Sequence, residues 1–200
     1  MGRPNKLPVV LTQKEAIKLL SQPNKRYPTG HRNYAMLVAM YRAGLRVSEL
    51  ISLKARHIDA NRNIITVIEG KGAKDRNIKV EPWVIDALLT WNAKRLQLPD
   101  PDKEKRLFVT LQGRQLRDRY VRTMVKREAA AAGIDKDIHP HTLRHTYATE
   151  LLEAGYTIIE VQEQLGHSFV STTQIYTHVT KSHLDEKTMA RHEQWQRLHP

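Results

Sequence analysis

A change in hydrophobic period is the feature of this sequence that most constrains its fold. Apolar residues recur at helical spacing over most of the chain, but three short stretches at 57–59, 64–69 and 76–80 are rich in β-branched residues. Turn-forming residues at 61–63 and 70–75 separate them. The sequence therefore predicts a mostly helical α+β domain with one small antiparallel sheet and a tight loop at 70–75.

Signals for helix starts and ends place the helices around this sheet. Thr12 and Glu15 match a capping box, which predicts a helix start, and Pro82 suits a first helical position. Glycines follow several of the predicted helices, as is typical of helix ends. The predicted helices after the first cover 31–43, 47–53, 82–96, 114–132, 140–154, 158–165 and 170–177, with an amphipathic one around Leu184, Met189 and Trp195. Residues 107–110 are predicted to be extended, and no internal repeat or inter-domain linker is visible.

The charge balance points to a polyanionic partner. Lysine and arginine number 33 against 21 aspartates and glutamates, which gives a formal net charge of +12. Nucleic acid is the first candidate and an anionic membrane surface the second, while a merely soluble basic protein remains open.

Other functional classes are excluded by composition. The chain has no cysteine, so disulfides, thiolate zinc sites and cysteine nucleophiles are ruled out. It also lacks an apolar stretch of signal-peptide or membrane-span length, so we expect a soluble cytoplasmic protein. No lysine-rich amphipathic helix stands out, so a membrane surface is the weakest candidate partner and we expect no membrane binding.

The most informative local pattern is a histidine and an arginine three positions apart. On a helix, His141 and Arg144 would lie on one face, and a phosphate is a natural anion to sit between them. His141 and His145 have a spacing that could bind zinc, but the metalloprotease pattern requires glutamate where this chain has Thr142.

Four further positions are informative only in combination with His141 and Arg144. Arg46 lies at a predicted helix start, Lys71 stands between two glycines in the predicted tight loop, and Gly166 places His167 on a turn. Each alone has an ordinary explanation as a surface charge or a turn residue. Tyr176, in a predicted amphipathic helix, would by itself be read as a core residue.

Taken in order, these motifs resemble the tyrosine recombinases, also called phage integrases. The matching motifs are GLRVSEL at 44–50, GKG at 70–72, PHTLRHTYAT at 140–149, LGH at 165–167 and Tyr176. The resemblance extends from about residue 11 to 178. It assigns the family's catalytic set to Arg46, Lys71, His141, Arg144, His167 and Tyr176.

The resemblance implies a specific reaction and assembly. Tyr176 would attack a DNA phosphodiester to form a 3′-phosphotyrosyl intermediate, and a DNA 5′-hydroxyl would later reverse the attack. No cofactor and no metal would be needed. The partner would be double-stranded DNA, and the protein would be associated with the nucleoid. It would form a homotetramer on paired DNA sites and could be a monomer in solution. The outcome would be integration, excision, inversion or resolution.

Basic residues outside this set are candidate contacts to backbone phosphates. They are Lys74, Arg76, Arg117, Arg119 and Arg122. Such contacts position a protein on DNA without reading its sequence. Each residue could instead be a solvated surface charge.

The front of the chain departs from the usual family plan. Most members carry an N-terminal helical domain, whereas here an extended arm at 1–11 precedes a catalytic domain at 12–180, followed by a C-terminal tail or helix at 181–200. We expect either an excised catalytic domain or a short single-domain recombinase, like the fimbrial-switch invertases. The tail would either dock on a neighbouring protomer or pack on its own domain.

Two other functions remain open at this point. A topoisomerase-like nicking-closing enzyme would use the same site as a monomer. A DNA-binding regulator on an inactive recombinase scaffold would not need the intact set of six catalytic residues.

Overall fold

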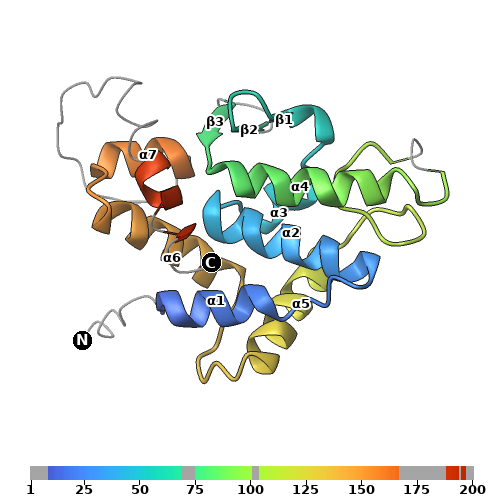
Figure 1. Cartoon of the computed structure of the whole chain (residues 1–200), viewed down its shortest axis with the longest axis horizontal. Helices are drawn as coiled ribbons and strands as arrows, with labels where there is room; N and C mark the ends of the chain where they lie inside the picture. The colour runs from blue at the N-terminus through green and yellow to red at the C-terminus, as the bar shows by residue number, and fades with distance from the viewer. Residues whose placement is uncertain (1–8, 69–74, 101–103, 167–187, 194, 197–200) are drawn as a thin grey trace, which may run out of the picture.

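A small sheet lies at one edge of a mostly helical domain in this computed structural model, which describes residues 9–68, 75–100, 104–166, 188–193 and 195–196 (Figure 1). The helices are α1 (Gln13–Ser21), α2 (Pro28–Arg42), α3 (Val47–Ser52), the 3-10 turn η1 (Ala55–His57), α4 (Pro82–Arg95), α5 (Asp118–Ala131), α6 (Pro140–Glu153) and α7 (Ile158–Leu165). The strands are β1 (Ile58–Asp59), β2 (Ile64–Val67) and β3 (Arg76–Lys79). This architecture confirms the predicted α+β class.

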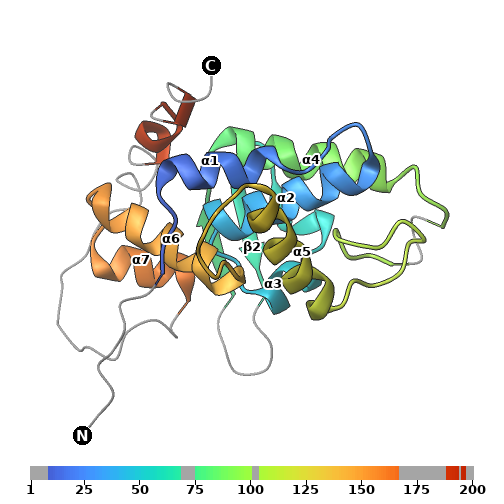
Figure 2. The ribbon, with the colours of Figure 1, turned by 90° about the horizontal axis from the view of Figure 1, so that it is seen from below.

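Helix α2 is the centre of the core. The residues from Ala35 to Arg42 are all buried, and α2 packs against α1, α3, α4, α5 and α6. Figure 2 shows α6 and α7 together at one end of the molecule, with α4 and α1 lying along α2. A helix that is apolar on nearly every side needs such an all-round cover, because exposed apolar surface costs free energy.

The sheet is antiparallel, in the order β1-β2-β3. Ile65 of β2 pairs with Ile78 of β3, and both side chains are fully buried, so one face of the sheet joins the core. The three strands lie within the stretches that the change of period predicted. The turn expected at 70–75 lies outside the described residues, except for Asp75.

Two helices start at positions that the sequence did not predict. α2 begins at Pro28, three residues earlier than expected, because proline fits the first turn of a helix. α5 begins at Asp118 and not at residue 114, because Gly113 has a positive φ of 68° in a tight turn and Val109 pairs with Gln115. The predicted helix at 170–177 lies outside the described residues.

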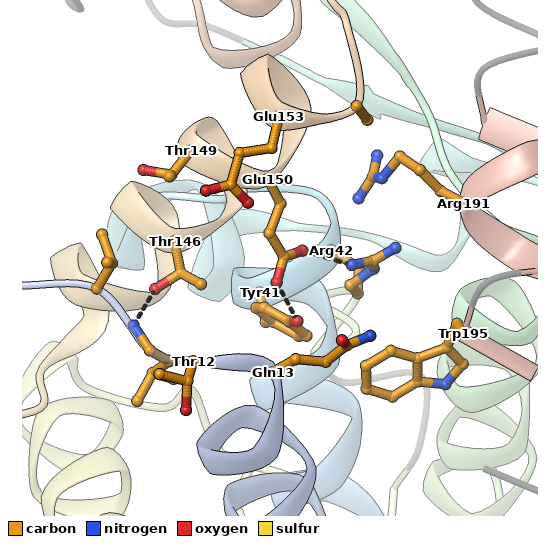
Figure 3. A pocket seen from close by; sticks show the side chains of 13 residues that line it. Thr12, Gln13, Tyr41, Arg42, Thr146, Thr149, Glu150, Glu153, Arg191 and Trp195 are labelled. Carbon is orange, nitrogen blue, oxygen red and sulfur yellow. Dashed lines mark hydrogen bonds and ion pairs between the residues drawn. The ribbon is translucent and has the colours of Figure 1, made fainter. Parts of the chain in front are cut away.

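The described part of the C-terminal segment is helical and packs on its own chain. Trp195 stacks on Trp83 of α4 with ring centroids 4.9 Å apart, and Arg191 lies 3.4 Å from the buried carboxylate of Glu81. Trp195 also borders a pocket of about 340 Å³ beside α6. Figure 3 shows Tyr41, Arg42 and Glu150 lining the same pocket, with a hydrogen bond from Tyr41 to Glu150, and the Tyr41 ring lies 6.0 Å from the Trp195 ring.

Within the described residues, the helices are too short or too polar to cross a membrane.

Candidate active site

The corner between α2 and α3 positions the first predicted catalytic residue. Arg46 is the N-cap of α3, and its guanidinium donates to the Glu49 carboxylate at 2.6 Å. The Arg46 backbone N–H donates to the same carboxylate at 2.8 Å. Both bonds hold the arginine at the helix start, with about a quarter of its side chain (26%) exposed.

Glycine is required at this corner. Gly44 has a positive φ of 59°, and a Cβ atom there would lie 2.6 Å from both Leu165 and Tyr147. The close approach lets α6 and α7 pack directly on the corner. As a result, the Gly44 carbonyl accepts a hydrogen bond at 2.5 Å from Arg144, a second predicted catalytic residue.

Arg144 is held more tightly than Arg46. Its guanidinium also donates to the Leu165 carbonyl at the end of α7, at 2.5 Å, and its side chain is only 2% exposed. One guanidinium nitrogen lies 3.9 Å from the Glu49 carboxylate. Tertiary contacts from two different segments therefore fix this arginine beside Arg46.

Glu49 is a site residue that the sequence analysis missed. It is nearly buried and receives two hydrogen bonds from Arg76 of β3, at 3.0 and 2.9 Å, as well as those from Arg46. Burial disfavours its charge, but the bonds from Arg76 and Arg46 outweigh burial and lower its pKa. A signal was present in the sequence, because glutamate three residues after a helix N-cap is a capping position.

His141 lies in the first turn of α6 and is exposed. Partial burial lowers its pKa, and the charges of His139 and nearby arginines, including Arg144 and Arg46, lower it further. The imidazole is therefore neutral at neutral pH and can accept a proton. His139 caps the helix by accepting the Thr142 backbone N–H at 3.2 Å.

The structure thus brings together three of the six predicted catalytic residues. Arg46 and Arg144 share Glu49, and both act electrostatically on His141. Lys71, His167 and Tyr176 lie outside the described residues, as does the candidate DNA contact Lys74.

The buried tyrosines are poor nucleophiles. Tyr147 of α6 is fully buried, which raises its pKa to about 12. Burial, assisted by the neighbouring Glu150, raises the pKa of Tyr41 even further. A phenol that is both inaccessible and hard to ionise cannot act as a nucleophile, so neither tyrosine is a candidate for this role.

The remaining candidate DNA contacts differ in their surroundings. The Arg76 guanidinium is nearly buried between Glu49 and the Gln164 carbonyl, which favours a positioning role over a DNA contact. Arg117 and Arg119 are exposed at the start of α5 and line an open groove of about 980 Å³. Arg122 pairs with Asp118 at 2.5 Å on the exposed surface of α5.

The fold and the site together define a basic helical domain that gathers arginines and a histidine at one corner. The sequence matches the Phage integrase family over residues 9–183, and the chain belongs to this family.

Named relatives show which members of the family this chain resembles. The chain is 41% identical over 180 residues to the tyrosine recombinase XerD of Staphylococcus saprophyticus, covering 90% of this chain and 61% of that protein. It is 37% identical over 196 residues to the tyrosine recombinase XerC 1 of Ralstonia nicotianae, covering 90% of this chain and 59% of that protein. The chain therefore spans only part of the length of these relatives.

Solved structures show the same fold. The XerA recombinase superposes with a TM-score of 0.76 at 34% identity, over 94% of this chain and 66% of that one. The XerH site-specific recombinase bound to palindromic difH substrate, a post-cleavage complex, gives 0.71 at 28% identity, over 97% of this chain and 52% of that one. The integrase from mycobacterium phage Brujita gives 0.68 at 27% identity, over 94% of this chain and 59% of that one.

Proposed function

We propose that this protein is a site-specific DNA recombinase that cuts and rejoins strands through a 3′-phosphotyrosyl intermediate on Tyr176. The observation that carries the proposal is the grouping of Arg46 and Arg144 around Glu49, beside an exposed histidine with a lowered pKa. Such a group suits phosphoryl transfer, because charge builds on the phosphate oxygens in the transition state.

The described residues have distinct roles in this reaction. The guanidinium groups of Arg46 and Arg144 stabilise the non-bridging oxygens, and their planar forks match phosphate geometry. His141, neutral at neutral pH, relays the proton of the attacking phenol. Glu49 touches neither phenol nor phosphate and acts by holding Arg46 and Arg76 in place.

The other three catalytic residues complete the proposal by family resemblance. Tyr176 is the nucleophile, Lys71 protonates the departing 5′-oxygen, and His167 donates a further hydrogen bond to the phosphate. The energy of the DNA phosphodiester bond is conserved in the phosphotyrosyl ester, so the rejoining step needs no ATP.

We also propose the assembly and its place in the cell. The substrate is double-stranded DNA, held by a homotetramer on paired sites, and the protein works in the cytoplasm at the nucleoid. Residues 12–180 form the catalytic domain, between an arm at 1–11 and a tail at 181–200. The DNA complexes known for XerH are consistent with a DNA substrate.

Trapping the covalent intermediate tests the proposal. The protein is incubated with nicked suicide duplexes from a random-sequence library, and DNA that stays attached after denaturation is recovered. Wild-type protein should yield an adduct whose peptide map places the DNA on Tyr176. Tyr176→Phe should yield none while still binding DNA, whereas Tyr27→Phe, at an exposed tyrosine, should behave as wild type.

The location of the adduct decides the outcome. DNA attached to any residue other than Tyr176 would refute the mechanism, and so would an adduct in the Tyr176→Phe variant. Relaxation of a supercoiled plasmid by a monomer, without exchange between paired sites, would instead identify a nicking-closing enzyme.

A further inference from the structure

A pocket lined by cationic residues lies next to the candidate active site. It has a volume of about 260 Å³ and is walled by the end of α3, the turn η1 and strand β2. Four of its lining residues carry or can carry positive charge: Lys54, Arg56, His57 and Arg106.

The charges in this pocket do not cancel. Arg106 is paired with Glu104 at 2.7 Å, and the one carboxylate in the wall, Glu49, already binds two arginines. Among the residues that the structure describes, neither Lys54 nor Arg56 forms an ion pair. The pocket therefore has a net positive charge that an anion would neutralise.

His57 lies in the field of the same cations. Partial burial lowers its pKa, the charges of Arg56 and Lys54 lower it further, and the carboxylate of Asp75 opposes them without reversing the shift. Its Nδ1 atom accepts the Lys54 backbone N–H at 3.4 Å, which ties the turn η1 together and keeps the cations close.

Glu49 connects this pocket to the candidate active site. It lines the pocket wall, and the same carboxylate binds Arg46 at 2.6 Å and Arg76 at 2.9 Å. The two sites are therefore one side chain apart. Successive phosphates of one DNA strand are separated by only about 3.4 Å of helix rise, so a strand held at Arg46 has other phosphates within reach of the pocket.

We propose that the pocket formed by Lys54, Arg56 and His57 binds a backbone phosphate flanking the one at the active site. The exposed Arg56 supplies a planar fork for two phosphate oxygens, and the Lys54 ammonium adds a point charge. The contact anchors the strand, so that the reacting phosphate is presented to Arg46 and His141. This inference rests on the proposed recombinase function, because it requires a DNA strand at the site.

Salt dependence of DNA binding tests the contact without knowledge of the target sequence. Affinity for a random-sequence duplex is measured across salt concentrations for wild type and for the double variant Lys54→Ala/Arg56→Ala. Losing one phosphate contact should lower the slope of log affinity against log salt by about 0.9. Thermal unfolding is measured alongside, to show that the variant is folded.

A charge-matched control separates a specific contact from a general loss of charge. Lys18→Ala/Arg26→Ala removes two exposed cations outside the pocket and should leave the slope unchanged. An unchanged slope in the pocket variant, or an equal fall in the control, would overturn the proposal.

Titration with inorganic pyrophosphate distinguishes a DNA contact from a site for a small anion. If the pocket variant loses pyrophosphate binding but keeps the wild-type DNA slope, the pocket takes a free anion and the proposal fails. Adduct formation is scored separately: a lowered slope without any adduct would support the pocket and refute the recombinase function instead.

Discussion

At the scale of single residues, the carboxylate of Glu49 holds several arginines in place. Glu49 is bonded to Arg46 and Arg76 and lies 3.9 Å from Arg144. Like charges repel one another, and the Glu49 carboxylate between these arginines offsets that repulsion. The carboxylate is nearly buried, and removing one partner of a buried ion pair costs on the order of 3 kcal/mol.

Glu49→Gln should therefore impair both stability and cleavage. We expect adduct formation to slow by roughly a hundredfold, because displaced arginines no longer fit the transition state. The folded-state pKa of Glu49 lies below its usual value of 4.5, so its stabilisation is complete above that value and is lost as pH falls through the lowered pKa. In acid titrations, the unfolding free energy of wild type should fall as pH drops through the lowered pKa of Glu49. That fall should be absent in Glu49→Gln. Asp137→Asn, which breaks an exposed pair with Lys126, should change neither property.

The two arginines should respond differently to truncation. Arg46→Ala and Arg144→Ala should each slow adduct formation roughly a hundredfold, on the scale of losing one transition-state donor. Arg144→Ala should also lower the melting temperature, because it leaves the Gly44 and Leu165 carbonyls without a buried donor. Arg46, at a partly exposed helix start, should affect melting much less. Equal melting temperatures for the two variants would contradict the difference in burial between Arg144 and Arg46.

His141 predicts the pH dependence of cleavage. A proton relay must be neutral to accept a proton, and burial and nearby cations hold its pKa below the usual 6.5. The single-turnover rate should therefore rise with pH through a value below 6.5 and stay level near pH 7. An inflection above pH 6.5 would show that another group controls the rate. His141→Gln should abolish the inflection.

At the scale of elements, a buried charge network attaches the C-terminal helix. Glu81, at the start of α4, is fully buried and lies against Arg42 of α2 and Arg191 of the C-terminal segment. Burial disfavours its charge, but the two arginines outweigh burial and lower its pKa. The stacked rings of Trp195 and Trp83 add an apolar contact to the same attachment.

Glu81→Gln should loosen this attachment. It leaves Arg42 and Arg191 with one buried carboxylate fewer, so we expect a loss of about 3 kcal/mol in unfolding free energy. Hydrogen exchange should increase over residues 188–196 more than over α1. Trp195→Ala should raise exchange in the same segment while keeping the charge network. Uniform exchange changes across the chain would mean that the network stabilises the whole domain and not the tail.

At the scale of the whole molecule, the net charge of +12 predicts how the protein meets its substrate. Each neutralised phosphate releases counterions, so affinity for duplex DNA should fall steeply as salt rises. Measuring affinity at several salt concentrations gives the slope directly. A flat plot would rule out phosphate-dominated binding and would weaken the proposal that DNA is the substrate.

The sequence alone determined most elements of this fold and the family to which the chain belongs. Local signals have local causes: the Thr12–Glu15 capping box starts α1, Thr157 caps α7, and the β-branched stretches form the sheet. The motifs around Arg46 and Arg144 likewise indicated the family, because their residue types and order depend on no distance in space.

Only the tertiary structure decided which charges meet. Arg76 was predicted as a DNA contact from its sequence position alone, and the fold places its guanidinium on Glu49 of α3. Arg144 bonds to carbonyls 100 and 21 residues away along the chain. The spacing of residues in a sequence fixes neighbours on one helix, but contacts between segments depend on how the core packs. Here that packing includes the close approach of Tyr147 and Leu165 to Gly44, where any side chain would hold the segments apart.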